Sequence, residues 1–223
     1  MLKNYLQIYN LSIVIIGDFN PVIIQPFWLA HKKLIREQEA QTANVEIIHQ
    51  EVVRYSLDWL NVEITKDKFT LSSKQEPFFE PLKDLVISIF SILSETPLRA
   101  IGLNHLKYFS IPDKTRHYQF GNVLAPLSNF KDSFEDPRLL NLEIIEQPRK
   151  DIFNGSIRTR IYPSDLKLQL PFGVAIDVND HYDIGSEKNS SANEMVNLLT
   201  NQWDFSLKKS EEIVENIWSK INP

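Results

Sequence analysis

The sequence predicts an α+β protein, in which an antiparallel sheet of about six to eight strands has one face covered by a central amphipathic helix and C-terminal helices. Two observations lead to this prediction. Apolar residues alternate at nearly period two over residues 45–71 and again over 98–109, which is typical of half-buried strands. Over residues 81–94 the period changes to that of a helix with one apolar stripe. Such a stripe is buried when the helix lies on one face of a sheet.

The first third of the chain is predicted to consist mainly of strands. The β-branched run LSIVII at 11–16 indicates the first strand. Prolines at positions 21 and 26 then favour a turn and an irregular segment, because proline cannot donate to a strand ladder. Residues 30–41 predict a short polar helix. The alternation over 45–71 predicts two or three strands, with a hairpin turn at KDK, 66–68.

The central helix and the next strand follow from a change in periodicity. The apolar stripe of the helix consists of Leu82, Leu85, Val86, Ile89, Phe90 and Leu93. Pro81 precedes the stripe and Pro97 follows it, so both ends of the helix are marked. Alternation resumes from Leu98, which predicts a return to a strand.

Three further strands and a helical tail complete the prediction. The strands are LLNLEIIE, GSIRTRIYPSD and FGVAIDVND, and Asn154-Gly155 is a hairpin signal between the first two. The tail is predicted to be helical from Ser190. Ser191 and Glu194 have capping-box spacing, and a break is expected at 203–206.

Strands followed by a helix occur twice along the chain, which suggests a βββα pseudo-duplication with halves 1–96 and 97–223. The two halves share no residue-level identity. A length of 223 residues lies within the range of one large domain, so we expect a single α+β domain over 1–223.

Composition excludes several classes of protein. The chain is 43% hydrophobic and 24% charged, which is typical of a globular protein. Its net charge of −5 makes nucleic acid an unlikely partner. The absence of cysteine excludes disulfides, thiolate catalysis and cysteine-based zinc sites, and fits a cytoplasmic location. The apolar run at 11–16 is too short to span a bilayer and lacks the features of a signal peptide, so no membrane association is expected.

The segment DVNDHYDIG, residues 177–185, holds the strongest candidates for chemistry. Asp177, Asp180 and His181, with Asp183, are residue types that bind magnesium, manganese or zinc. On a strand, however, Asp177 and His181 share a face that Asp180 does not. The favoured interpretation is therefore a strand that ends in an Asn-Asp turn, and we predict no metal or other cofactor.

Three arginines are candidates for anion binding. Arg99 lies close in sequence to Asn104 and His105, although pairing with Glu95 would explain it equally well. Arg158 and Arg160 alternate on one strand and therefore project from one face, with Arg149 and Lys150 just upstream. The alternative for this pair is a solvated sheet face on which Glu143 and Glu146 of the neighbouring strand balance the charge.

Aromatic residues in expected loops favour a protein interface. Phe27, Trp28, Phe78 and Phe79 are the main candidates, and Tyr118 and Phe120 have a similar setting. No HExxH, GxSxG, P-loop or GxGxxG motif accompanies them, and six glycines are few for a phosphate-binding loop.

Three stretches resemble a sporadically distributed bacterial family of uncharacterised proteins. They are GDFNPVIIQPFW at 17–28, SETPLRAIGLNHLKYF at 94–109 and FGVAIDVNDHYDIG at 172–185. The resemblance spans most of the chain. It implies no activity, cofactor or catalytic residue, but the patchy distribution of the family is similar to that of mobile or defence-associated genes. A co-encoded partner is therefore expected.

The leading hypothesis is a non-enzymatic binding or regulatory subunit that acts as a homodimer or with a co-encoded partner. The alternative is a metal-dependent hydrolase or nuclease that uses Asp177, Asp180 and His181, with Arg158 and Arg160 holding a phosphate. A third hypothesis is a small-ligand sensor, with a cavity between sheet and helices lined by Trp59, Phe90 and Trp218.

Overall fold

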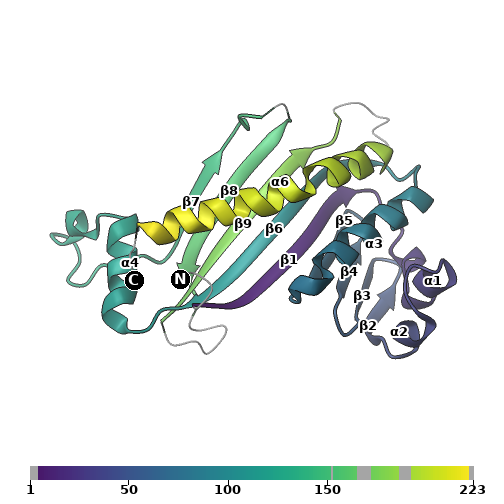
Figure 1. Ribbon diagram of the computed structural model, residues 1–223, viewed down its shortest axis with the longest axis horizontal. Coiled ribbons are helices and arrows are strands. Elements are labelled where there is room, and N and C mark those ends of the chain that lie inside the picture. The colour runs from purple at the N-terminus through teal and green to yellow at the C-terminus, as the bar shows by residue number, and fades with distance from the viewer. Residues whose placement is uncertain (1–4, 152, 165–171, 186–191, 221–223) are drawn as a thin grey trace.

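The fold is α+β, and the framework of the described residues is one antiparallel sheet of nine strands (Figure 1). The computed structural model describes residues 5–151, 153–164, 172–185 and 192–220. The strand order is β2-β3-β4-β5-β1-β6-β9-β8-β7. The strands are β1 (Leu6–Gly17), β2 (Asn44–His49), β3 (Val52–Ser56), β4 (Asn61–Thr65), β5 (Lys68–Ser73), β6 (Leu98–Ser110), β7 (Leu142–Glu146), β8 (Gly155–Pro163) and β9 (Gly173–Asp183).

The nine strands found in the described part of the chain exceed the six to eight that the sequence predicts. The difference arises over residues 45–71, which were expected to form two or three strands and instead contribute to four. β2 and β3 are separated by the turn at 50–51, and β4 and β5 by the expected turn at 66–67. Turns this short leave little trace in the apolar pattern, so one continuous alternation hides the reversals.

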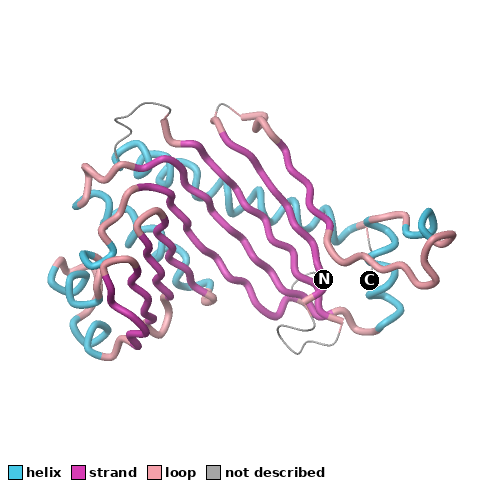
Figure 2. The backbone as a smooth tube through the Cα atoms, turned by 180° about the vertical axis from the view of Figure 1, so that it is seen from behind, coloured by secondary structure: helices cyan, strands magenta, loops and turns pink. Residues whose placement is uncertain are grey.

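Helices α3 (Phe79–Ile92) and α6 (Ala192–Ser219) lie on the same face of the sheet (Figure 1). Seen from behind, the strands are not covered by any helix of the described chain (Figure 2). The sheet therefore has a helix-covered face and an open face. Shorter helices α1 (Pro26–His31) and α2 (Glu37–Gln41) lie beside β2 and β3, and α4 (Lys114–Leu124) lies beyond the far end of α6.

Alternation along the strands directs one set of side chains to the helix-covered face. In β1, Leu11, Ile13 and Ile15 are fully buried there, whereas Ser12 and Val14 are only partly buried on the open face. The stripe of α3 meets this layer through Leu82, Leu85, Val86, Ile89 and Phe90, all buried. Trp203 of α6 joins the two helices, because its Nε1 donates to Glu80 Oε1 of α3 at 2.5 Å.

α6 runs without interruption from 192 to 219, so the expected break at 203–206 is wrong. Its buried stripe continues through Trp203, Ser206 and Ser210 to Val214. The two serines interrupt the apolar pattern because they face polar residues of β6, namely His105 and Lys107. The start expected at Ser191 lies outside the described residues.

The connection after β7 also differs from the prediction. Asn154-Gly155 does not form a two-residue hairpin, because residues 147–154 separate β7 from β8. Gly155 instead begins β8 with φ +135°, and a Cβ there would lie 2.1 Å from the carbonyl oxygen of His181. Glycine is therefore required by both backbone conformation and close approach.

The chain order of the elements is similar in the two halves of the sheet. β1 pairs with β5, the last strand before α3, and β6 pairs with β9, the last strand before α6. β1 and β6 pair with each other at the centre. Among the described residues, no helix is long and apolar enough to cross a membrane.

Candidate functional site

The residues expected to form a metal site lie on β9, which places them on opposite faces of the sheet. Asp180 points to the helix-covered face and is buried, whereas Asp177 and His181 lie on the open face. Strand β9 continues through Asp183, so the Asn-Asp turn expected near position 179 is absent. Asp177 and His181 are four residues apart, which corresponds to about 13 Å along a strand. The three proposed metal ligands therefore do not converge.

Asp180 belongs to a buried ion-pair network. The guanidinium of Arg149 donates to Asp180 through Nη1 and to Asp151 through Nε and Nη2, the last bond at 2.6 Å. The hydroxyl of Tyr182 donates to the other oxygen of Asp180 at 2.8 Å, and Arg149 lies 3.9 Å from the Tyr182 ring centre. Hydrogen bonds from Arg149 lower the pKa of Asp151. This network satisfies Asp180 without a ligand.

On the open face, Asp177 lies beside the arginines expected to bind an anion. Arg160 is its direct register partner on β8, and Arg158 is two residues away on the same face. Burial raises the pKa of Asp177, and the positive charges of Arg158 and Arg160 act in the opposite direction. Arg158 also pairs with Glu143 at 3.3 Å. Glu143 thus pairs with Arg158, and Asp177 lies opposite Arg160, so carboxylates accompany both cations as in the solvated-face alternative.

Arg99 lies apart from these two arginines. Its Nη1 donates to Asp18 Oδ1 at 2.7 Å, and its Nη2 donates to the carbonyl oxygen of Gly17 at 3.0 Å. Arg99 therefore anchors the turn after β1 rather than pairing with Glu95, and it does not share a site with Arg158.

His181 also has a local partner, Asp183, with His181 Nε2 and Asp183 Oδ1 3.2 Å apart. No group of three acidic or histidine residues within the described ranges is arranged to hold a metal ion.

The aromatic residues expected at an interface differ in exposure. Phe27 on α1 is 67% exposed and remains available. Phe79 is the first residue of α3 rather than a loop residue; it is buried and packs edge-on against Tyr9. Phe78 stacks on Trp59 at 5.2 Å, and Trp28 packs against the core. Phe79 is therefore a core residue, and its predicted place at an interface is wrong.

Both edges of the sheet expose apolar side chains. All six residues of β2 are exposed, including Val45, Ile47 and Ile48. At the other edge, Ile144 and Ile145 of β7 are 55% and 54% exposed. Neither strand contains lysine or proline, which commonly protect edge strands from pairing. The alternation over 45–71 includes β2 among the predicted strands, but it does not reveal that β2 is an exposed edge strand.

A polar layer separates the two apolar clusters under α6. Tyr9 Oη lies 2.7 Å from His105 Nδ1, and Ser206 Oγ lies 3.0 Å from His105 Nε2. Burial, followed by the charge of Lys107, lowers the pKa of His105 to about 3. Burial also lowers the pKa of Lys107, whose Nζ lies over the Tyr9 ring at 4.6 Å. His105 is fully buried, so this layer holds the helix on the sheet rather than offering a binding site.

A row of uncharged polar side chains crosses the open face. In direct register from β2 to β9 it consists of Asn44, Ser56, Asn61, Ser72, Ser12, Asn104 and Asn179, and it ends at Arg158 of β8. Asn179 Nδ2 donates to Asn104 Oδ1 at 2.5 Å. The row depends on strand register, which no local pattern reveals. These polar side chains allow the open face of the sheet to be in contact with water.

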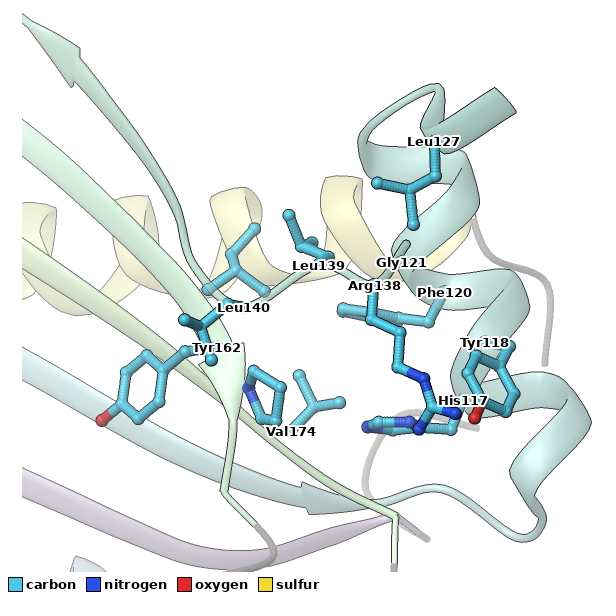
Figure 3. Close-up of a pocket in the computed structure, with 12 residues that line it drawn as sticks. His117, Tyr118, Phe120, Gly121, Leu127, Arg138, Leu139, Leu140, Tyr162 and Val174 are labelled. Carbon is cyan, nitrogen blue, oxygen red and sulfur yellow. The ribbon is translucent and has the colours of Figure 1, made fainter. Parts of the chain in front are cut away.

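The three residues expected to line a cavity between sheet and helices belong to two different apolar clusters, with Trp59 and Phe90 in one and Trp218 in the other. Phe90 of α3 is fully buried in the first apolar cluster, and Trp218 packs beside Phe109 in the second. A pocket of about 230 Å³ lies between α4, the segment 138–140, the end of β8 and the start of β9 (Figure 3). Sequence reasoning missed α4, because its residues mix aromatic and polar types without one clear apolar face.

Comparisons with known proteins add no identity to this geometry. No family model matches the chain, and no curated protein matches it.

Proposed function

We propose that this protein is a non-enzymatic binding or regulatory subunit that acts through protein–protein contacts, and that its edge strands provide the contact surface. The observation that carries the proposal is β2, in which all six side chains are exposed and three are apolar. An edge strand also presents unpaired backbone N–H and C=O groups. A strand added by a partner would pair these groups and bury the apolar side chains together.

The second edge supports the same mode of contact. Ile144 and Ile145 of β7 are exposed, and Leu140 just before this strand is 81% exposed. Exposed apolar residues in this number at both ends of one sheet are typical of interfaces rather than of scattered surface positions. Helix α1 lies near β2 (Figure 1) and carries the exposed aromatic residue Phe27.

The partner is either a second copy of the chain or a co-encoded protein. The resemblance to the sporadically distributed bacterial family favours a co-encoded partner in a defence or mobile-element system. A net charge of −5 and the pairing of Arg158 with Glu143 give no reason to expect nucleic acid. The absence of cysteine is in keeping with a cytoplasmic location.

We further infer that the chain is one domain that arose by pseudo-duplication. The supporting observation is that β1 and β6 occupy equivalent places at the centre, each paired with the strand that precedes the helix of its half. The first half then carries one additional strand, β2, and this strand is the exposed edge.

The hydrolase alternative has weaker support. It needs Asp177, Asp180 and His181 to act together, and Asp180 points to the other face, where Arg149 already holds it. Calorimetry with manganese on the wild type and on His181→Ala would test it directly.

Size-exclusion chromatography with light scattering tests the protein–protein proposal, on the protein alone and after co-expression with its genetic neighbours. We expect a dimer or a defined complex that Ile48→Lys on β2 or Ile145→Lys on β7 disrupts, because each places a charge at an edge. Ile92→Lys is the matched control, since Ile92 is 43% exposed, as Ile48 is, but lies on α3. A monomer under all conditions, or equal disruption by the control, would overturn the proposal.

A further inference from the structure

The pocket beside α4 combines an apolar wall with a cationic end. The walls include Phe120, Leu127, Leu139, Ile161 and Val174, of which Phe120, Ile161 and Val174 are buried. Figure 3 shows the side chain of Arg138 extending toward His117 and Tyr118, while Leu139 and Leu140 lie on the other side. A molecule in this pocket would therefore meet apolar carbon at one end and a guanidinium at the other.

The guanidinium of Arg138 is held in place but retains donor capacity. Its Nε and Nη2 donate to Asp136 Oδ2 at 3.1 and 2.6 Å, and its carbon lies 4.5 Å from the Tyr118 ring centre. Nη1 has no hydrogen-bond partner within the described part of the chain. The ion pair and the stacking orient the group, and Nη1 remains available to a ligand.

The charges around the pocket limit the ligand to a single negative charge. A second hollow on the other side of Tyr118 and Arg138 brings Lys114 and Lys131 near, but Glu135 and Asp136 line it as well. These carboxylates would repel a polyphosphate or a dianion. No carboxylate is among the described residues that line the apolar pocket itself, so a metal ion has no hard ligand there.

We propose that this pocket binds a small apolar monocarboxylate with a flat body, as in an aromatic acid. The ring would lie among Phe120, Val174 and the other apolar side chains, and the carboxylate would accept from Arg138 Nη1 beside His117. A volume of about 230 Å³ accommodates a single ring with a short acid side chain rather than a nucleotide. A charge-assisted hydrogen bond would orient the molecule.

Isothermal titration calorimetry with cinnamate tests the proposal, with neutral cinnamamide and acetate as comparison ligands. We expect saturable binding of cinnamate, roughly tenfold weaker binding of cinnamamide, and no measurable binding of acetate, because both the ring and the charge are recognised. Arg138→Gln should weaken cinnamate binding by roughly tenfold. Leu127→Trp, which fills the pocket from a half-buried position, should abolish it.

Arg116→Gln is the matched control, because Arg116 is an ion-paired arginine of α4 that does not line the pocket. We expect it to bind cinnamate within about twofold of the wild type. Equal binding of cinnamate and cinnamamide, unchanged binding by Arg138→Gln, or no binding up to about 1 mM would overturn the proposal. None of these variants alters β2 or β7, so the result is separate from that of the protein–protein proposal.

Discussion

Arg149 and Asp180 form an ion pair that is closed to solvent on both sides, with side chains 0% and 2% exposed. The same Nη1 of Arg149 donates to the backbone oxygen of His181 at 3.2 Å, so the guanidinium is also hydrogen-bonded to the backbone of β9. Arg149 lies in the connection between β7 and β8, and Asp180 lies on β9. The pair therefore fixes an irregular segment to the regular sheet.

Replacing Asp180 by asparagine should destabilise the protein strongly. The guanidinium of Arg149 would stay buried and lose one of its two carboxylates, and such broken pairs cost about 3 to 5 kcal/mol. Because Asp151 still binds Arg149 through Nε and Nη2, we expect a loss of about 3 kcal/mol, the lower end of that range. The free energy of unfolding in urea measures it.

Asp177→Asn is the control for this prediction, since it makes the same chemical change on the same strand but on the open face. Burial already disfavours the charged form of Asp177, so its loss should change stability by less than about 1 kcal/mol. Similar losses for the two variants would contradict a structural role specific to Asp180.

Stability should fall on mild acidification because of His105. Burial lowers its pKa from 6.5 to about 3, so between these values the unfolded chain binds a proton that the folded chain does not. The free energy of unfolding should therefore be undiminished above pH 6.5 and decline as the pH falls toward 3, by up to about 1.4 kcal/mol per pH unit. Urea unfolding at a series of pH values measures the slope.

His105→Gln should flatten this dependence, because glutamine retains hydrogen-bonding groups for Tyr9 and Ser206 but does not titrate. Ser206→Ala is the comparison. It removes one hydrogen-bond partner of His105 and should lower stability. The imidazole stays buried next to Lys107, so the slope of stability against pH should be unchanged. Identical slopes for the wild type and His105→Gln would show that other groups cause the acid sensitivity.

The pKa of Asp177 should respond to its arginine neighbours. Burial raises this pKa, and the charges of Arg158 and Arg160 oppose the shift, so Arg160→Gln should raise it further. Carboxyl carbon chemical shifts followed by NMR titration measure the change. Arg99→Gln is the control. It removes an arginine that is bound to Asp18, and it should leave the pKa of Asp177 unchanged. A fall in this pKa with Arg160→Gln would contradict the arrangement.

The sequence predicts the regular elements of this fold well where one face of an element is apolar. The α3 stripe is an example, because every member from Leu82 to Phe90 faces the same packed layer. α6 shows the limit of this reasoning. Ser206 and Ser210 are buried like the apolar members of its stripe, but they are polar because His105 and Lys107 lie opposite. Periodicity cannot anticipate a partner that is about a hundred residues away in sequence.

The candidate site could be predicted only in part for a related reason. Alternation on β9 correctly separates Asp177 and His181 from Asp180. The partner of Asp180, however, is Arg149, which local pattern grouped with Arg158 and Arg160 as a surface cation. The pocket beside α4 depends on how a loop, a helix and two strand ends meet. Only tertiary packing decides this, so no sequence motif marks it.

Gly155→Ala should destabilise the protein severely. Its φ of +135° is unfavourable for any residue with a Cβ, and the added atom would lie 2.1 Å from the His181 carbonyl oxygen on the neighbouring strand. Relief of this clash requires β8 to separate from β9, so we expect the free energy of unfolding to fall by about 3 kcal/mol or more.

Gly121→Ala is the matched control, because Gly121 is helical and an added Cβ meets its nearest neighbour, Leu139 Cβ, at 3.3 Å. There a gain of up to about 1 kcal/mol in helix propensity offsets the close contact, and thermal unfolding of both variants distinguishes the two outcomes. Equal effects at the two positions would mean that β8 can shift at Gly155 without losing its pairing to β9.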